Sequence, residues 1–213
     1  MKGQQEALVH ALTKTMSRSH SFVVNALVWR APYAEFAVVG WLMIGGALWL
    51  GQDVIAGAGG AATALFGCWL LALLVGISAI DARFGIIPDS MTLWLALGGL
   101  LQLVLLDWQS AAMRIAGSAF VFTLAVGVRA AYRAVRGYEG LGFGDVKFVT
   151  VGVIWIGLEG VPVLMLTAVA SALVSLVIVR ARGETISAVH PIAFGPHLAL
   201  GLWLAWVIGP IPF

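Results

Sequence analysis

Long apolar stretches separated by short polar connections constrain the fold of this chain more than any other feature. They fall at about 33–52, 55–80, 91–106, 115–132, 146–158, 161–179 and 192–211. A membrane-spanning helix needs roughly 20 mostly apolar residues. With 61% hydrophobic and 10% charged residues, a soluble domain of this length could not bury so much apolar surface. The sequence therefore predicts an all-α bundle of about seven transmembrane helices in a lipid bilayer.

The number of spans is the open part of this prediction, because 91–106 and 146–158 are short for a span. Short spans can tilt, pack against neighbouring helices or extend into the headgroup region. Six or eight spans therefore remain alternatives to seven.

Residues 1–32 are predicted to form a separate cytoplasmic or membrane-surface segment, followed by one transmembrane domain over 33–213. Leu8, Leu12 and Met16 recur at four-residue spacing, which is typical of an amphipathic helix lying on a membrane. A partly ordered cytoplasmic tail is an equally good interpretation. No apolar stretch with a small-residue cleavage site lies in the first 20 residues, so a signal peptide is not expected.

The basic residues indicate the orientation of the chain in the membrane. If the N-terminus is cytoplasmic, every Lys and Arg except Arg114 falls in a cytoplasmic segment or at the cytoplasmic end of a span. Asp53, Asp107 and Glu159 fall on the opposite side. Cytoplasmic loops of membrane proteins carry this excess of Lys and Arg. We therefore expect a cytoplasmic N-terminus. The net charge of +2 is too small to suggest a nucleic-acid partner.

A first group of polar residues lies between the second and third predicted spans. Asp81 follows the second span directly, whereas Pro88, Asp89 and Ser90 precede the third. Asp89 is expected to cap the following helix, because Asp and Ser are favoured at that position. Asp81 has two interpretations: an interfacial ion pair with a nearby arginine, or a functional carboxylate.

A second group precedes the fifth predicted span. Gly140, Gly142 and Gly144 alternate in a segment that ends in Asp145, with Lys147 close behind. Asp145 is expected at a helix N-terminus, where the helix dipole favours the ionised carboxylate. A flexible loop with a capping aspartate is the simpler interpretation. Phosphate binding is not expected, because no strand precedes the glycines and no Gly-Lys-Ser/Thr follows them.

Asp81 and Asp145 together suggest a reaction, because both fall on the cytoplasmic side at the ends of different spans. Two nearby carboxylates do not both ionise easily, so they share a proton. The ionised carboxylate can take a proton from water while the protonated one donates to a peptide carbonyl. This aspartic proteolysis needs no metal and no cofactor.

Metal and disulfide chemistry find little support elsewhere in the sequence. Cys68 is the only cysteine, which excludes four-cysteine zinc sites and disulfides within the chain. His190 and His197 occur without a third ligand in a recognisable pattern. We therefore predict no metal site.

The two aspartate segments resemble those of the type IV prepilin peptidases, a family of membrane aspartic proteases with a Gly-x-Gly-Asp motif. A third segment, Phe194-Gly195-Pro196, is similar to the family's late Pro-Phe-Gly-Pro, with Ala193 in place of the first proline. The three segments occur in the family's order and cover about 55–213.

The resemblance implies that Asp81 and Asp145 are the catalytic pair. It also implies that the short basic leader of a type IV prepilin or pseudopilin is removed at the cytoplasmic face of a bacterial inner membrane, alongside pilus or secretion machinery. The active-site loop would comprise Gly142, Phe143 and Gly144. Supporting or substrate-binding roles would then fall to Pro88, Asp89, Glu139, Lys147, Phe194, Gly195 and Pro196.

The sequence departs from the family in one respect. Many members carry a cytoplasmic segment with two Cys-x-x-Cys pairs that is associated with N-methylation, whereas this chain has a single cysteine. It therefore resembles a short form, and methylation stays open. The alternative function is a small transporter or channel, which would place carboxylates near the bilayer midplane, often in paired repeats. A scaffold subunit of a pilus or secretion machine is a third option.

Overall fold

The computed structural model describes residues 45–46, 61–137, 140–181 and 193–209, and the regular structure in these ranges is helical. The all-α fold is therefore confirmed. The helices that follow residue 60 are α3 (Ala61–Phe84), α4 (Asp89–Leu106), the short 3-10 helix η1 (Trp108–Ser110), α5 (Ala111–Arg136), α6 (Phe143–Ile156), α7 (Val161–Ala181) and α8 (Gly195–Ile208). The predicted segment 1–32 and almost all of the predicted span 33–52 lie outside the described residues.

Four helical stretches of the described part are long and apolar enough to cross a membrane: Ala61–Phe84, Asp89–Leu106, Trp108–Arg136 and Val161–Ile178. The predicted total of about seven spans is not confirmed. Two of the predicted spans, 146–158 and 192–211, correspond to α6 and α8, which have 14 residues each. At 1.5 Å per residue such a helix is about 21 Å long, less than the roughly 30 Å hydrocarbon core of a bilayer.

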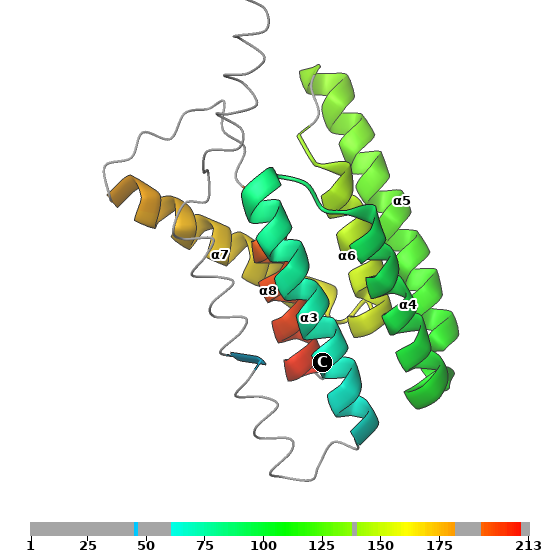
Figure 1. Cartoon of the computed structure of the whole chain (residues 1–213). Coiled ribbons are helices and arrows are strands. Elements are labelled where there is room, and N and C mark those ends of the chain that lie inside the picture. Colours follow the sequence, from blue (N-terminus) through cyan, green and yellow to red (C-terminus); the bar gives the residue numbers. More distant parts are fainter. Residues whose placement is uncertain (1–44, 47–60, 138–139, 182–192, 210–213) are drawn as a thin grey trace, which may run out of the picture. The chain divides into compact units, whose positions relative to one another are not determined.

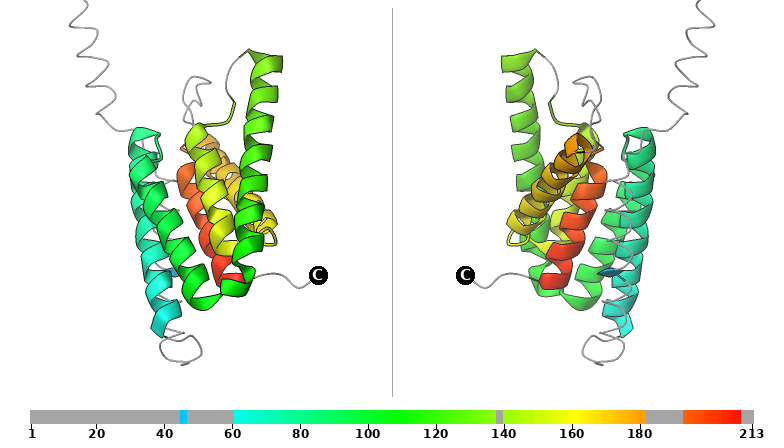
Figure 2. Two further views of the ribbon diagram at one scale, coloured as in Figure 1. Left: turned by 90° about the vertical axis from the view of Figure 1, so that its right-hand side faces the viewer. Right: turned by 90° about the vertical axis from the view of Figure 1, so that its left-hand side faces the viewer.

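The two short helices lie between the longer ones (Figures 1 and 2). Helix α6 packs against α4, α5 and α8, and helix α8 packs against α3, α6 and α7. Phe148 of α6 and Leu198 and Leu202 of α8 are fully buried in the hydrophobic core. By contrast, α4, α5 and α7 turn large apolar side chains outward, as expected for helices that face lipid; examples are Leu105, Phe120 and Leu166.

Glycine allows α4 to approach α6 closely. A side chain at Gly99 would place its Cβ only 2.8 Å from the indole nitrogen of Trp155. That nitrogen donates a hydrogen bond to the Leu95 carbonyl of α4 over 2.9 Å. Because Trp155 is almost fully buried, this hydrogen bond satisfies a donor that would otherwise be costly inside the bundle.

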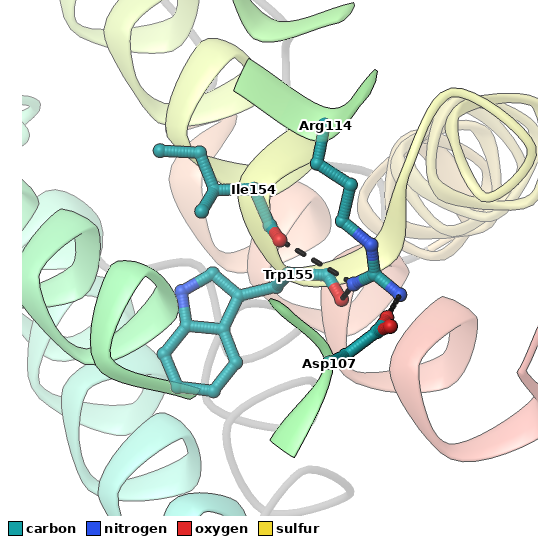
Figure 3. Close-up of polar contacts among 4 residues, drawn as sticks. All are labelled: Asp107, Arg114, Ile154 and Trp155. Atoms are coloured by element: carbon teal, nitrogen blue, oxygen red, sulfur yellow. Dashed lines mark hydrogen bonds and ion pairs between the residues drawn. The ribbon is translucent and has the colours of Figure 1, made fainter. Parts of the chain in front are cut away.

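Arg114 holds the C-terminal end of α6 (Figure 3). Its guanidinium donates to the Trp155 carbonyl over 2.6 Å and to the Ile154 carbonyl over 3.4 Å, and it pairs with Asp107 over 3.0 Å. The last carbonyls of a helix have no partner within the helix. Arg114, the exception to the charge asymmetry of the sequence, therefore caps the end of α6 that lies opposite Asp145.

Candidate active site

Asp81 lies in the last turn of α3 and is 5% exposed. The helix extends to Phe84, one turn beyond the end predicted for the second span, and then stops at Gly85. Gly85 adopts a left-handed φ of 67°, and its N–H donates to the Asp81 carbonyl over 2.7 Å. A left-handed glycine is a common helix terminator. Asp81 is therefore fixed within a helix, not in the loop that follows it.

The carboxylate of Asp81 contacts the start of α8. Its Oδ2 accepts a hydrogen bond from the Gly195 backbone N–H over 2.7 Å. A Cβ on Gly195 would lie 2.6 Å from the same oxygen, so only glycine allows this approach. Because the N-terminus of a helix carries partial positive charge, α8 favours the ionised form of the carboxylate it faces.

The residues beside Gly195 form the first turn of α8. Phe194 is the N-cap residue, and its carbonyl accepts hydrogen bonds from the amides of His197 and Leu198. Pro196 lies within the first two helical positions, where its missing N–H leaves no helical hydrogen bond unmade. The Phe194-Gly195-Pro196 segment thus begins a helix and directs one amide at Asp81.

Asp145 lies in the first turn of α6, as predicted. Gly142 is the N-cap residue, and its backbone N–H donates to the Asp145 carboxylate. This is the arrangement in which an acidic residue in the first turn satisfies the amide of the cap residue. The prediction of a three-residue active-site loop was wrong in part. Phe143 and Gly144 belong to α6, because the chain becomes helical directly after Gly142.

Burial raises the pKa of Asp145 from 3.8 to about 6, and the neighbouring charge of Asp81 contributes to the increase, whereas the hydrogen bond from Gly142 opposes it. The fold therefore brings the two carboxylates within electrostatic reach of each other. Asp145 holds a proton up to a pH at which an ordinary aspartate has lost it. Two carboxylates coupled in this way titrate as a pair.

The connection between α3 and α4 packs against the start of α6. A Cβ on Gly144 would lie 3.2 Å from the Cβ of Ile87, a closer contact than side chains normally make. Gly144 therefore has a packing role: it lets the first turn of α6, with Asp145, lie against the segment that follows Asp81.

Asp89 does not occupy the cap position predicted for it, because Pro88 takes that position. Pro88 is the N-cap residue of α4, with an extended backbone, and no side chain caps the helix. The prediction that Asp89 caps α4 was wrong, because Asp89 is already the first helical residue. Its carboxylate instead forms an ion pair with Lys147 of α6. The Asp89 side chain is 79% exposed, which distinguishes it from the buried Asp81.

Phe143 lies next to two cationic groups at the start of α6. The Arg129 guanidinium is 5.2 Å and the Lys147 ammonium 5.1 Å from the centre of its ring. Cations at this distance are attracted to the face of an aromatic ring. These contacts connect the ends of α5 and α6. Glu139, a predicted supporting residue, lies outside the described residues.

One pair of residues near this site was missed by the sequence reasoning, which considered His197 only as a metal ligand. His197 is fully buried, and its Nδ1 lies 3.0 Å from the Ser171 hydroxyl of α7. A histidine within an apolar stretch was the signal available, but nothing in the sequence identified Ser171 as its partner.

Comparison with known proteins shows a family match over the part of the chain that contains Asp81 and Asp145. The model of the type IV leader peptidase family matches residues 64–179. A relative from Burkholderia pseudomallei, named prepilin leader peptidase/N-methyltransferase, is 37% identical over 160 residues, which are 73% of this chain and 50% of the relative. A relative of the same name from Dickeya chrysanthemi is 31% identical over 176 residues, 83% of this chain and 59% of the relative.

The match is partial with respect to these relatives. The chain spans about half the length of the curated relatives it matches, as the 50% coverage of the Burkholderia pseudomallei protein illustrates. No solved structure matches the chain significantly.

Proposed function

The chain belongs to the type IV leader peptidase family, and from this premise we propose that it is a membrane aspartic endopeptidase acting on type IV prepilins or pilin-like precursors. It removes the short basic leader at the cytoplasmic face of a bacterial inner membrane, using Asp81 and Asp145. The single observation that carries this proposal is the pair of neighbouring carboxylates: burial raises the pKa of Asp145 to about 6, and the charge of Asp81 contributes to that increase.

The environments of the two aspartates support different roles in proton transfer. The Gly195 amide and the N-terminus of α8 offset part of the cost of ionising the buried Asp81. Burial and the neighbouring charge favour a protonated Asp145. In the proposed reaction, Asp81 takes a proton from water, and the resulting hydroxide attacks the scissile carbonyl. Asp145 donates its proton to the carbonyl oxygen, so a neutral tetrahedral diol forms.

Collapse of the diol completes the hydrolysis. The carboxylate left on Asp145 takes back a hydroxyl proton as the carbonyl re-forms, and the proton now held by Asp81 passes to the leaving amine. The C–N bond breaks, and both carboxyl groups return to their starting protonation states. No covalent intermediate forms, so the chain needs no side-chain nucleophile for this reaction.

The position of the carboxylates favours a peptidase over a transporter. Asp81 lies in the last turn of α3 and Asp145 in the first turn of α6. A transporter would place ion-binding carboxylates near the bilayer midplane, at breaks within helices. A prepilin carries its cleavage site next to an apolar helix that stays in the membrane, so a pair at helix ends suits that substrate.

Replacement of each aspartate tests the proposal. In lipid–detergent micelles, the wild-type chain should convert a prepilin to its shorter form, whereas folded Asp81→Asn and Asp145→Asn variants should not. Asn keeps the size of the side chain but cannot exchange the proton. Full conversion by a folded Asp145→Asn variant would refute the mechanism.

A further inference from the structure

The polar contact between α7 and α8 lies at the level of the turn that holds Asp81. Ser171 of α7 and His197 of α8 meet over 3.0 Å between Oγ and Nδ1. His197 is two residues beyond Gly195, whose amide contacts the Asp81 carboxylate. Any shift of the first turn of α8 relative to α7 would therefore also move the hydrogen-bond donor to Asp81.

The hydrogen bonds determine which nitrogen of His197 carries the proton. The Ser171 hydroxyl has a single hydrogen, which it donates to the Ala168 carbonyl over 3.0 Å. The tautomer that satisfies both contacts has the hydrogen on Nδ1, which donates it to the Ser171 hydroxyl. Nε2 is left with a lone pair, and it is buried without a hydrogen-bond partner among the described residues.

Because Nε2 has no hydrogen-bond partner in the part of the chain that the structure describes, His197 contributes less to stability there than an apolar side chain would. A buried acceptor without a partner costs about 1–3 kcal/mol, and an apolar side chain of similar shape would avoid that cost. The surroundings are apolar: Leu198 and Ala199 beside it and Ala168 across the interface are all fully buried.

The two helices also approach closely further along their interface. A side chain on Gly201 of α8 would collide with the backbone of Leu164 on α7. Gly201 lies one turn after His197, and Leu164 lies two turns before Ser171, so the helices run antiparallel with both contacts on one interface. Gly201 fixes their separation, which leaves the Ser171–His197 hydrogen bond to set the rotation and register of the first turn of α8.

We propose that Ser171 and His197 are positioning residues for the peptidase reaction: their hydrogen bond fixes the start of α8 so that the Gly195 amide meets the Asp81 carboxylate. This inference rests on the proposed function. It deepens that function by assigning a role to a histidine that touches neither carboxylate in the structure.

The experiment compares single variants for prepilin processing and thermal unfolding. His197→Leu and Ser171→Ala should lower kcat about 10- to 100-fold with KM unchanged, since small displacements of reacting groups cost rates of this order. His197→Leu should unfold at the same temperature or higher, because it removes the unpaired Nε2. His197→Asn should restore kcat, since its amide nitrogen can take the place of Nδ1, whereas the longer His197→Gln should not.

Ser175→Ala is the matched control, because Ser175 lies one turn further along the same helix and is buried, whereas Ser171 is half-buried. It should retain wild-type kcat. If folded His197→Leu and Ser171→Ala both retain wild-type kcat, the positioning role is refuted. The role is also refuted if their kcat falls only in proportion to the fraction unfolded.

Amide hydrogen exchange at 194–198 separates failure of this inference from failure of the proposed function. The Gly195 amide should exchange faster in His197→Leu and Ser171→Ala, and at the wild-type rate in His197→Asn. If the wild-type chain processes no prepilin, the proposed function fails, and the exchange rates alone decide whether the hydrogen bond holds α8 in place. Unchanged exchange in His197→Leu would contradict the inference even in an active enzyme.

Discussion

The Gly195 amide donates a hydrogen bond to the Asp81 carboxylate over 2.7 Å, joining residues 114 positions apart in the sequence. It connects the C-terminal turn of α3 to the N-terminal turn of α8. The position of the Asp81 carboxylate therefore depends on α8, a helix near the C-terminal end of the described residues.

Gly195→Ala tests this contact. The added methyl group would lie 2.6 Å from the Asp81 oxygen, so either the carboxylate or α8 must move. We expect prepilin processing to fall about 10- to 100-fold. Gly127→Ala is the control, because Gly127 lies within α5 and a Cβ there meets no atom within 4 Å. Equal activity of the two variants would contradict the importance of the contact.

The pH dependence of stability should reveal the protonated Asp145. Because its pKa in the folded chain, about 6, exceeds the ordinary value of 3.8, folding favours the protonated form. The resulting stabilisation is fully present below pH 4 and is lost as the pH rises through 6. Thermal unfolding of the wild type between pH 4 and pH 8 should show this loss. Asp145→Asn should not show this loss of stability with rising pH. An identical pH dependence of unfolding in both proteins would disprove the raised pKa of Asp145.

Removing the charge of Asp81 should lower the pKa of Asp145, since that charge is one cause of its increase. The pKa should still stay above 3.8, because burial is the larger cause. Carboxyl-carbon NMR of selectively labelled aspartate in Asp81→Asn measures the value directly. A pKa that stays at about 6 in this variant would mean that the carboxylates do not interact.

Asp89 should matter much less than Asp81. Its side chain is 79% exposed, and its ion pair with Lys147 lies at the surface of the site. Exposed ion pairs contribute about 0–1 kcal/mol, so Asp89→Asn should change processing by no more than about fivefold. Asp81→Asn should abolish processing in the same assay. An inactive Asp89→Asn beside an active Asp81→Asn would reverse the choice of catalytic aspartate.

Arg114 should contribute to stability without taking part in the reaction. Arg114→Met removes hydrogen bonds to two carbonyls at the end of α6 and should lower the free energy of unfolding by about 1–3 kcal/mol. Arg136→Met, at an exposed position of the same helix, should have a smaller effect. Chemical denaturation of both variants gives the comparison, and equal losses would argue against the capping role.

The sequence predicted the membrane helices well where apolar stretches were long, as in α3 and α7. It could not distinguish a helix that faces lipid from one surrounded by protein, because both are apolar. The predictions of 146–158 and 192–211 as spans are therefore not confirmed, since α6 and α8 have only 14 residues each. The capping prediction for Asp89 failed because Pro88 takes the cap position, and the partner of Asp89 lies 58 residues away, at Lys147.

In the candidate site too, local sequence patterns predicted individual residues but not the contacts between helices. Asp81, Asp145 and Gly195 were singled out from local motifs, and the position of Asp145 at a helix start followed from the glycines before it. The contact between Gly195 and Asp81 depends on how α8 packs against α3, which no local pattern encodes. Ser171 could not be predicted either, because its contact with His197 depends on how α7 packs against α8. A serine within an apolar helix has no neighbours in the sequence that mark it as functional.

The proposed pair combines helices of unequal length: Asp81 lies on the 24-residue α3 and Asp145 on the 14-residue α6. A bilayer of different thickness tilts a helix that spans it, at a cost of fractions of a kcal/mol per Å of mismatch. Helix α6, at about 21 Å, is shorter than the roughly 30 Å hydrocarbon core and packs against three other helices. Acyl-chain length should therefore shift one carboxylate of the proposed pair relative to the other, so we expect prepilin processing to depend on the lipid composition of the membrane.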